Sequence, residues 1–228
     1  MSTPASDPTA MPRAPLEEQF SSREQQELAG SFGMWVFLSS ELLFFGPLLL
    51  GYLYLRTHYP QACALASRHT DFWLGTVNTA MLLTSSLLFA LAGAAARADR
   101  RPQVVRLLLA TALLGLAFLA VKGWEWRAEF AEHLFPGAGF RPEGDVGAQV
   151  LHGMELFFLL YFALTGMHAL HMGAGLAACL LLAWRLRRAS SDPPAAASVE
   201  LAGLYWHFVD LVWIFLYPLL YLVGRAGA

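Results

Sequence analysis

Five long apolar segments constrain this chain more than any other feature of its sequence. A helix rises about 1.5 Å per residue, so about 20 apolar residues cross a hydrocarbon core of about 30 Å. Segments of that length are Ser31–Leu55, Phe72–Ala96, Val104–Trp124, His152–Trp184 and Gly203–Val223. We therefore expect an all-α fold, a polytopic membrane helix bundle with five transmembrane helices, formed by residues 31–228.

The composition also indicates a membrane protein. The chain is 57% hydrophobic and 14% charged, which is typical of polytopic membrane proteins rather than of soluble domains of this length. The formal net charge of −2 gives no reason to expect a nucleic-acid partner. Cys63 and Cys179 lie in different segments, so neither a disulfide nor a zinc site is expected.

Residues 1–30 differ from the rest of the chain. The first 20 residues contain prolines and no apolar core, which is not the pattern of a signal peptide. We expect residues 1–30 to form a disordered, polar N-terminal tail.

Basic residues predict the orientation in the membrane. If the N-terminus is cytoplasmic, the arginines at 97–106 and 185–188 are cytoplasmic as well. The connection 125–149, which is rich in Glu and Asp, then lies outside. The positive-inside rule therefore favours a cytoplasmic N-terminus and an outer C-terminus.

Several polar side chains lie inside the apolar segments. His207 and Asp210 are three residues apart and share one helix face. Glu41 and His168 lie near the bilayer centre, with His171 three residues beyond His168. An ionisable group there costs about 2.5–3.5 kcal/mol on insertion scales, so it is usually paired or functional.

These groups have one plain interpretation and three sharper ones. The plain one is that they join helices through buried hydrogen bonds, each contributing about 0.6–1.7 kcal/mol. The sharper ones are a proton relay, a lipid-headgroup site, and metal or haem ligation. A transition-metal site needs three or four convergent ligands, and the sequence has no dense cluster of them, so no metal site is predicted. Asn78 belongs to a further polar notch, NTAMLLTSS, where helices can approach closely.

Aromatic residues near the segment ends predict contacts with the membrane interface. Tryptophan is enriched where the bilayer meets water. We expect Glu125, which lies between two tryptophans, to be a solvated or headgroup-level carboxylate. The residues assigned to the interface are Trp35, Trp73, Trp124, Glu125 and Trp126.

Five sequence blocks together resemble a known family. They are SFGMWVFLSSELLFFGPLL, NTAMLLTSS, KGWEW, TGMHALHMGAG and YWHFVDLVWIFLYPLLY. Together, and in this order along the chain, they resemble subunit III of the haem–copper oxidases. This family is called the cytochrome c oxidase subunit III family. The resemblance covers about Ser31 to Gly224, and the five segments match the short bacterial form.

The resemblance implies a non-catalytic subunit of a respiratory haem–copper cytochrome c oxidase, multi-pass in the bacterial inner membrane. Such a subunit contains no catalytic residue, haem or copper. It packs with subunits I and II, which hold the haem and copper, binds structural phospholipids in a cleft, and supports proton uptake and stability of the catalytic subunit. The residues that match the family's buried lipid-cleft or helix-joining positions are Glu41, His168, His171, His207 and Asp210.

Two alternatives remain open at this stage. The stretch LFFLLYFALTGMHALHM is closer to the family branch found beside nitric oxide reductases, so the chain could be an accessory subunit of that enzyme. A stand-alone haem protein is the remote alternative. Two haems need four axial ligands, and only three histidines, His168, His171 and His207, lie in the interior of the apolar segments, since His152 is at the end of one.

Overall fold

The computed structural model describes residues 17–142, 146–188 and 196–225. Within these ranges every regular element is helical, and five helices are long and apolar enough to cross a membrane. Both the all-α prediction and the predicted number of spanning helices are thus confirmed. The five are α1 (Arg23–His58), α3 (Phe72–Arg97), α4 (Arg101–Ala131), α5 (Ala148–Arg188) and α6 (Ala196–Tyr217), the last continuing into a π-helical turn, η1 (Pro218–Leu222).

The first helix begins earlier than the apolar run that predicts it. Ser22 is its N-cap and accepts a hydrogen bond from the backbone N–H of Gln25 at 3.2 Å. Residues 23–30, which were expected to belong to the polar tail, are therefore helical. Residues 1–16 of the expected tail lie outside the described residues.

A short helix, α2 (Pro60–His69), was not predicted. Pro60 occupies its first turn, where a missing N–H costs nothing. Its inner face, which includes Cys63 and Ser67, is buried. The Ser67 hydroxyl accepts a hydrogen bond from the backbone N–H of Gly224 at 2.8 Å, so α2 and the C-terminal segment together close this end of the bundle.

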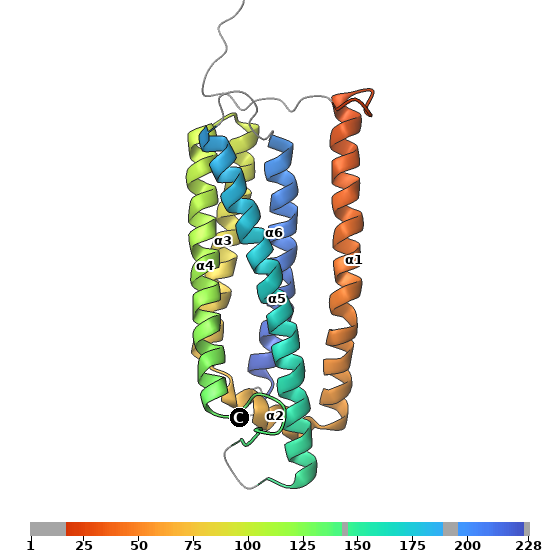
Figure 1. Ribbon diagram of the computed structural model, residues 1–228, viewed down its shortest axis with the longest axis vertical. Coiled ribbons are helices and arrows are strands. Elements are labelled where there is room, and N and C mark those ends of the chain that lie inside the picture. The colour runs from red at the N-terminus through yellow and green to blue at the C-terminus, as the bar shows by residue number, and fades with distance from the viewer. Residues whose placement is uncertain (1–16, 143–145, 189–195, 226–228) are drawn as a thin grey trace, which may run out of the picture.

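Helix α1 stands to one side of the group formed by α3, α4, α5 and α6 (Figure 1). Its buried apolar side chains lie mostly in its second half and include Phe45, Tyr52 and Leu55. The Tyr52 hydroxyl donates to the backbone carbonyl of Leu219. Most other large apolar side chains of α1 are exposed in this chain, and in a bilayer such a surface faces lipid or another protein.

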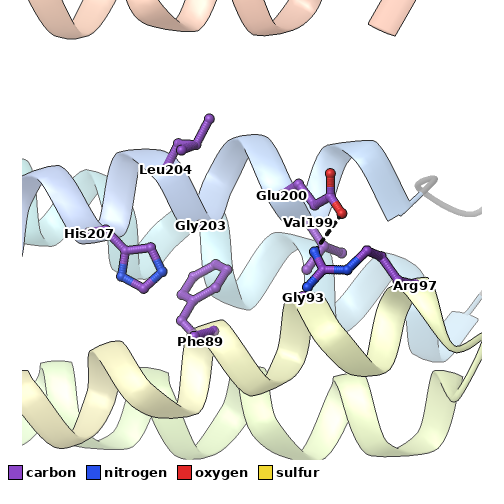
Figure 2. Close-up of a pocket in the computed structure, with 9 residues that line it drawn as sticks. Phe89, Gly93, Arg97, Val199, Glu200, Gly203, Leu204 and His207 are labelled. Atoms are coloured by element: carbon purple, nitrogen blue, oxygen red, sulfur yellow. Dashed lines mark hydrogen bonds and ion pairs between the residues drawn. The ribbon is translucent and has the colours of Figure 1, made fainter. Parts of the chain in front are cut away.

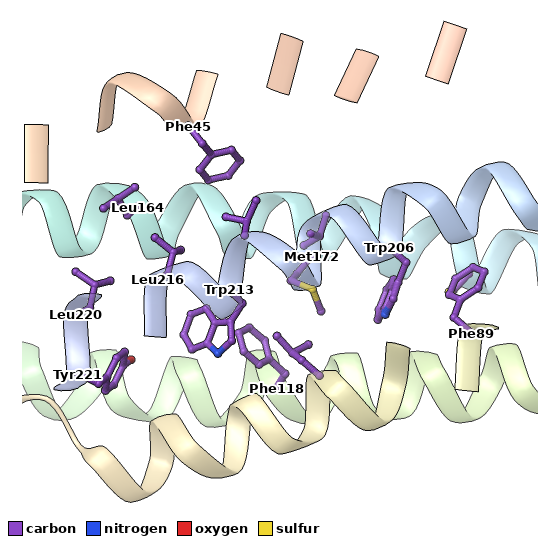
Figure 3. Packing of buried hydrophobic residues seen from close by; sticks show 14 of the residues in the cluster. Phe45, Phe89, Phe118, Leu164, Met172, Trp206, Trp213, Leu216, Leu220 and Tyr221 are labelled. Carbon is purple, nitrogen blue, oxygen red and sulfur yellow. The ribbon is translucent and has the colours of Figure 1, made fainter. Parts of the chain in front are cut away.

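The centre of the bundle is built around two tryptophans of α6. Trp213 packs edge-on against Phe118 of α4, with ring centroids 4.8 Å apart (Figure 3). Trp206 fits between two glycines: a Cβ at Gly115 would lie 2.7 Å from its ring, and one at Gly175 would lie 3.0 Å from it. These glycines let α4 and α5 approach α6 closely.

Candidate functional site

Hydroxyl groups of α3 bind aromatic residues of α6 in a regular series. The Trp213 indole donates to Thr79, and the Trp206 indole donates to Ser85, both at 3.1 Å. Thr76 and Tyr217 share a further bond of 2.6 Å between their hydroxyls. The NTAMLLTSS notch is thus the surface through which α3 contacts α6.

His207 belongs to the same series. Its Nδ1 lies 2.7 Å from the Ser86 hydroxyl. Asp210, one helical turn away, is buried, and neither of its carboxylate oxygens has a hydrogen-bond partner in the described parts of the chain. The two residues that share a face in the sequence therefore both lie beside Ser86 of α3.

A pocket of about 340 Å³ lies between α3 and α6 beside His207 (Figure 2). Its walls are mostly apolar, and an ion pair of 2.8 Å between Arg97 and Glu200 stands at the end away from His207. The residues that line it are Phe89, Ala90, Gly93, Arg97, Val199, Glu200, Gly203, Leu204 and His207. The pocket is thus apolar along most of its wall and has an ion pair at one end.

Glu41, like Tyr52, is a polar residue that joins α1 to the bundle. Its Oε2 lies 2.9 Å from Nε2 of His171 on α5, and both side chains are only partly buried. The Tyr205 hydroxyl of α6 donates to the backbone carbonyl of His171 at 3.1 Å. Phe45 packs on the same imidazole, with ring centroids 5.2 Å apart. Three helices therefore meet at this contact.

His168 and His171 do not converge on one site. His171 contacts α1, whereas His168 is fully buried and packs against the rings of Phe118 and Trp213 at 5.5 and 5.0 Å. Neither nitrogen of His168 has a hydrogen-bond partner within the described ranges, and the same holds for the side-chain amide of Asn78. No group of three His, Cys, Asp or Glu residues that could hold a metal ion occurs in the described parts of the chain.

The most extensive polar network is one that the sequence analysis missed. The Lys122 ammonium donates to Glu125 at 3.0 Å and to the hydroxyls of Tyr161 and Tyr221, both at 2.6 Å. The Tyr221 hydroxyl in turn donates to Glu125 at 2.9 Å, and the Tyr161 hydroxyl donates to Glu129 at 2.5 Å. Helices α4 and α5 and the turn η1 thus meet around a buried cation.

The interpretation of Glu125 as a solvated or headgroup-level carboxylate is therefore wrong. Its side chain is 3% exposed, because Lys122 and Tyr221 attract it into the bundle. A usable signal was present in the sequence: Lys122, Glu125 and Glu129 are spaced three and four apart, which places all three on one face of a helix.

The tryptophans near the helix ends fall into two groups. Trp35, Trp73 and Trp124 are exposed on the chain, so their assignment to the membrane interface stays a prediction. Trp126 instead packs against the core, near Phe162, and its indole N–H has no hydrogen-bond partner among the described residues.

Comparison with known proteins gives matches over nearly the whole chain. The family model for cytochrome c oxidase subunit III matches residues 20–225. Cytochrome c oxidase subunit 3 of Thermostichus vulcanus is 31% identical over 85% of this chain and 87% of its own length. A probable quinol oxidase subunit 3 of Staphylococcus aureus is 25% identical over 89% of this chain and 93% of its own length.

A third relative is much longer than this chain. The heme-copper oxidase subunit I+III of Aeropyrum pernix is 32% identical over 83% of this chain, and the match spans 22% of that relative. This chain therefore corresponds to about a fifth of that fused protein.

Proposed function

The chain belongs to the cytochrome c oxidase subunit III family, and from this premise we propose that it is a non-catalytic subunit of a respiratory haem–copper oxidase. The observation that carries the proposal is the family match over residues 20–225, which includes all five spanning helices. In this proposal the haem and copper are held by partner subunits, and electron transfer to oxygen takes place there.

Subunits I and II are the proposed partners. The Aeropyrum pernix relative is named as a fusion of subunits I and III, which favours a position of this chain beside subunit I. The apolar side chains of α1 that the bundle leaves exposed offer a surface for such a neighbour or for lipid.

The buried polar side chains are proposed to keep the helices in register against the catalytic subunit. Hydrogen bonds between membrane helices contribute about 0.6–1.7 kcal/mol each, so several together fix how the helices pack. The residues proposed for this role are Glu41, Asn78, His168, His171, His207 and Asp210. Three of them, Asn78, His168 and Asp210, have side-chain atoms without a hydrogen-bond partner among the described residues.

Structural phospholipids are the proposed ligands of the pocket between α3 and α6. An acyl chain would lie against Phe89 and Leu204, and a headgroup phosphate would approach Arg97. A subunit that holds lipid and packs beside subunit I would stabilise that subunit and support its proton uptake.

The proposed location is the bacterial inner membrane, with the N-terminus in the cytoplasm. The end of the bundle where α1 begins is also where α5 ends with Arg185, Arg187 and Arg188 and where α3 connects to α4 through Arg97 and Arg101. This concentration of arginines favours the cytoplasmic side.

The test is a detergent pull-down of the tagged chain, with optical spectra of the complex and of the subunit after it is stripped from the complex. Co-purification with haem and copper, and a colourless stripped subunit, is the expected result. Oxygen consumption with reduced cytochrome c or with a quinol then identifies the electron donor. A partner that contains haem b and non-haem iron would assign the chain to nitric oxide reductase, and haem that stays on the stripped chain would refute a non-catalytic role.

A further inference from the structure

The polar network around Lys122 contains more negative than positive formal charge. It holds one ammonium, Lys122, and two carboxylates, Glu125 and Glu129, and each of these side chains is no more than 3% exposed. If all three were ionised, the cluster would carry one uncompensated negative charge inside the protein. A buried charge without a partner is far more costly than a neutral polar group.

The hydrogen bonds show which carboxylate is the counter-ion of Lys122. All three N–H groups of the ammonium are used, on Glu125, Tyr161 and Tyr221. Glu125 Oε2 accepts from the ammonium itself and from Tyr221. Glu125 is therefore the carboxylate that the positive charge stabilises directly.

Glu129 has a weaker environment for a negative charge. The Tyr161 hydroxyl, at 2.5 Å from Oε1, is its hydrogen-bond partner, and this hydroxyl lies between Glu129 and the ammonium. The other oxygen, Oε2, is buried and has no hydrogen-bond partner in the described parts of the chain. Burying a neutral carboxylic acid with one unpaired oxygen costs less free energy here than burying a carboxylate with one unpaired oxygen.

We propose that the network of Lys122, Glu125, Glu129, Tyr161 and Tyr221 is a proton-binding site that holds one exchangeable proton on Glu129. The cluster is then neutral: Lys122 is charged, Glu125 is its counter-ion, and Glu129 is a carboxylic acid that accepts from Tyr161. This proposal does not depend on the identity of the complex that the chain joins.

The proton makes the stability of the packing of α4, α5 and η1 depend on pH. The folded chain binds one proton at Glu129 that the unfolded chain has released at neutral pH, so the free energy of unfolding falls as the pH rises. In the described parts of the chain, the ion pair of this cluster is Lys122–Glu125, and His168 on α5 is a further titratable side chain near Lys122. Glu132, the C-cap residue of α4, is exposed and adds negative charge, while the Arg225 guanidinium binds backbone carbonyls, including that of Tyr221.

The experiment compares three variants of the full-length chain, purified with the subunits that accompany it. Glu129→Gln removes the proton site and keeps an oxygen that accepts from Tyr161. Glu125→Gln removes the counter-ion, so that Glu129 should release its proton and replace it. Glu132→Gln changes an exposed carboxyl about one turn further along and is the matched control.

Infrared difference spectra and thermal unfolding are the two readouts. Wild type minus Glu129→Gln should show a carboxylic-acid C=O band that shifts in D₂O, and wild type minus Glu132→Gln should show none. Glu129→Gln should retain the wild-type unfolding temperature at neutral pH. As the pH rises, the wild type should lose stability while the band persists and should level off once the band is lost, whereas Glu129→Gln should lack this pH dependence.

Glu125→Gln should also lose the band, because its remaining carboxylate becomes the counter-ion. If this variant does not fold, the spectra and unfolding temperatures of Glu129→Gln still test whether Glu129 holds the proton. The proposal is overturned if Glu129→Gln removes no band and lowers the unfolding temperature at neutral pH, since both carboxylates would then be ionised. It is equally overturned if the band is absent and sodium or potassium ions raise the stability of the wild type but not of Glu129→Gln.

Discussion

Glu41 on α1 contacts the imidazole of His171 on α5. Nδ1 of His171 lies 2.9 Å from the backbone carbonyl of Met167, which can only accept, so Nδ1 must carry a hydrogen. Nε2 lies 2.9 Å from Glu41 Oε2. The two nitrogens of this imidazole therefore face different partners, one on its own helix and one on α1.

The first prediction concerns the attachment of α1. Glu41→Gln should weaken this contact and Glu41→Ala should abolish it, with a loss of about 0.6–1.7 kcal/mol in helix association. We expect less subunit to be retained in the purified complex, whereas turnover of the complexes that retain it should change little. Quantitative immunoblotting of the complex and an oxygen-consumption assay measure the two quantities.

Ser39→Ala is the control for Glu41, because the Ser39 hydroxyl is exposed and bonds within α1, to the carbonyl of Trp35. It should leave retention unchanged. Normal retention of Glu41→Ala combined with lost turnover would show that Glu41 acts in the reaction and not in attachment.

The second prediction concerns two glycines of α4. A Cβ at Gly115 would lie 2.7 Å from Cη2 of Trp206, whereas a Cβ at Gly123 would meet nothing within 4 Å. Gly115→Ala should therefore destabilise the protein by about 1–3 kcal/mol through overpacking. Gly123→Ala should be neutral or stabilise it by up to about 1 kcal/mol through helix propensity.

Circular dichroism during thermal or denaturant unfolding measures both glycine variants in the same detergent. The comparison separates packing from propensity, since both substitutions replace glycine by alanine in one helix. Equal stability of the two variants would mean that Trp206 does not occupy the groove beside Gly115.

The sequence predicted the spanning helices well because apolar length is a local property. The Phe72–Ala96 run corresponds to α3 almost residue for residue, and Asp71 caps that helix by accepting from Trp73 and Leu74. The starts of α1 and α6 were predicted too late, since both helices extend into polar residues that the apolar criterion excludes.

The polar contacts were harder to predict because their partners are distant in the chain. Helical spacing placed His207 and Asp210 on one face, but Ser86, which binds His207, lies 121 residues earlier. Lys122 lies two residues before the end of the predicted segment Val104–Trp124. The hydroxyls that bind it are 39 and 99 residues away, on Tyr161 and Tyr221. The helical packing that brings these hydroxyls to Lys122 cannot be predicted from the residues next to Lys122 in the sequence.

The third prediction concerns the reactivity of Cys63 on α2. Its side chain is fully buried, and burial raises the pKa of the thiol to about 11, although Arg56 acts in the opposite direction. At pH 8 about one thiol in a thousand would then be ionised, and the thiolate is the reactive form. Maleimide labelling at Cys63 should therefore be slow in the folded protein and fast after denaturation. Rapid labelling of the folded protein, located by peptide mapping, would show that α2 detaches from the bundle.

The fourth prediction uses introduced cysteines to establish the orientation. Gly139 lies in the connection between α4 and α5, and Arg187 lies in the last turn of α5, at opposite ends of the bundle, and both are exposed. The native thiols, Cys63 and Cys179, are buried and should give little background. With a cytoplasmic N-terminus, a membrane-impermeant maleimide added to intact cells should label Gly139→Cys and leave Arg187→Cys unlabelled until the membrane is opened. The reverse pattern would place the arginine-rich end outside, and the argument from the positive-inside rule would fail.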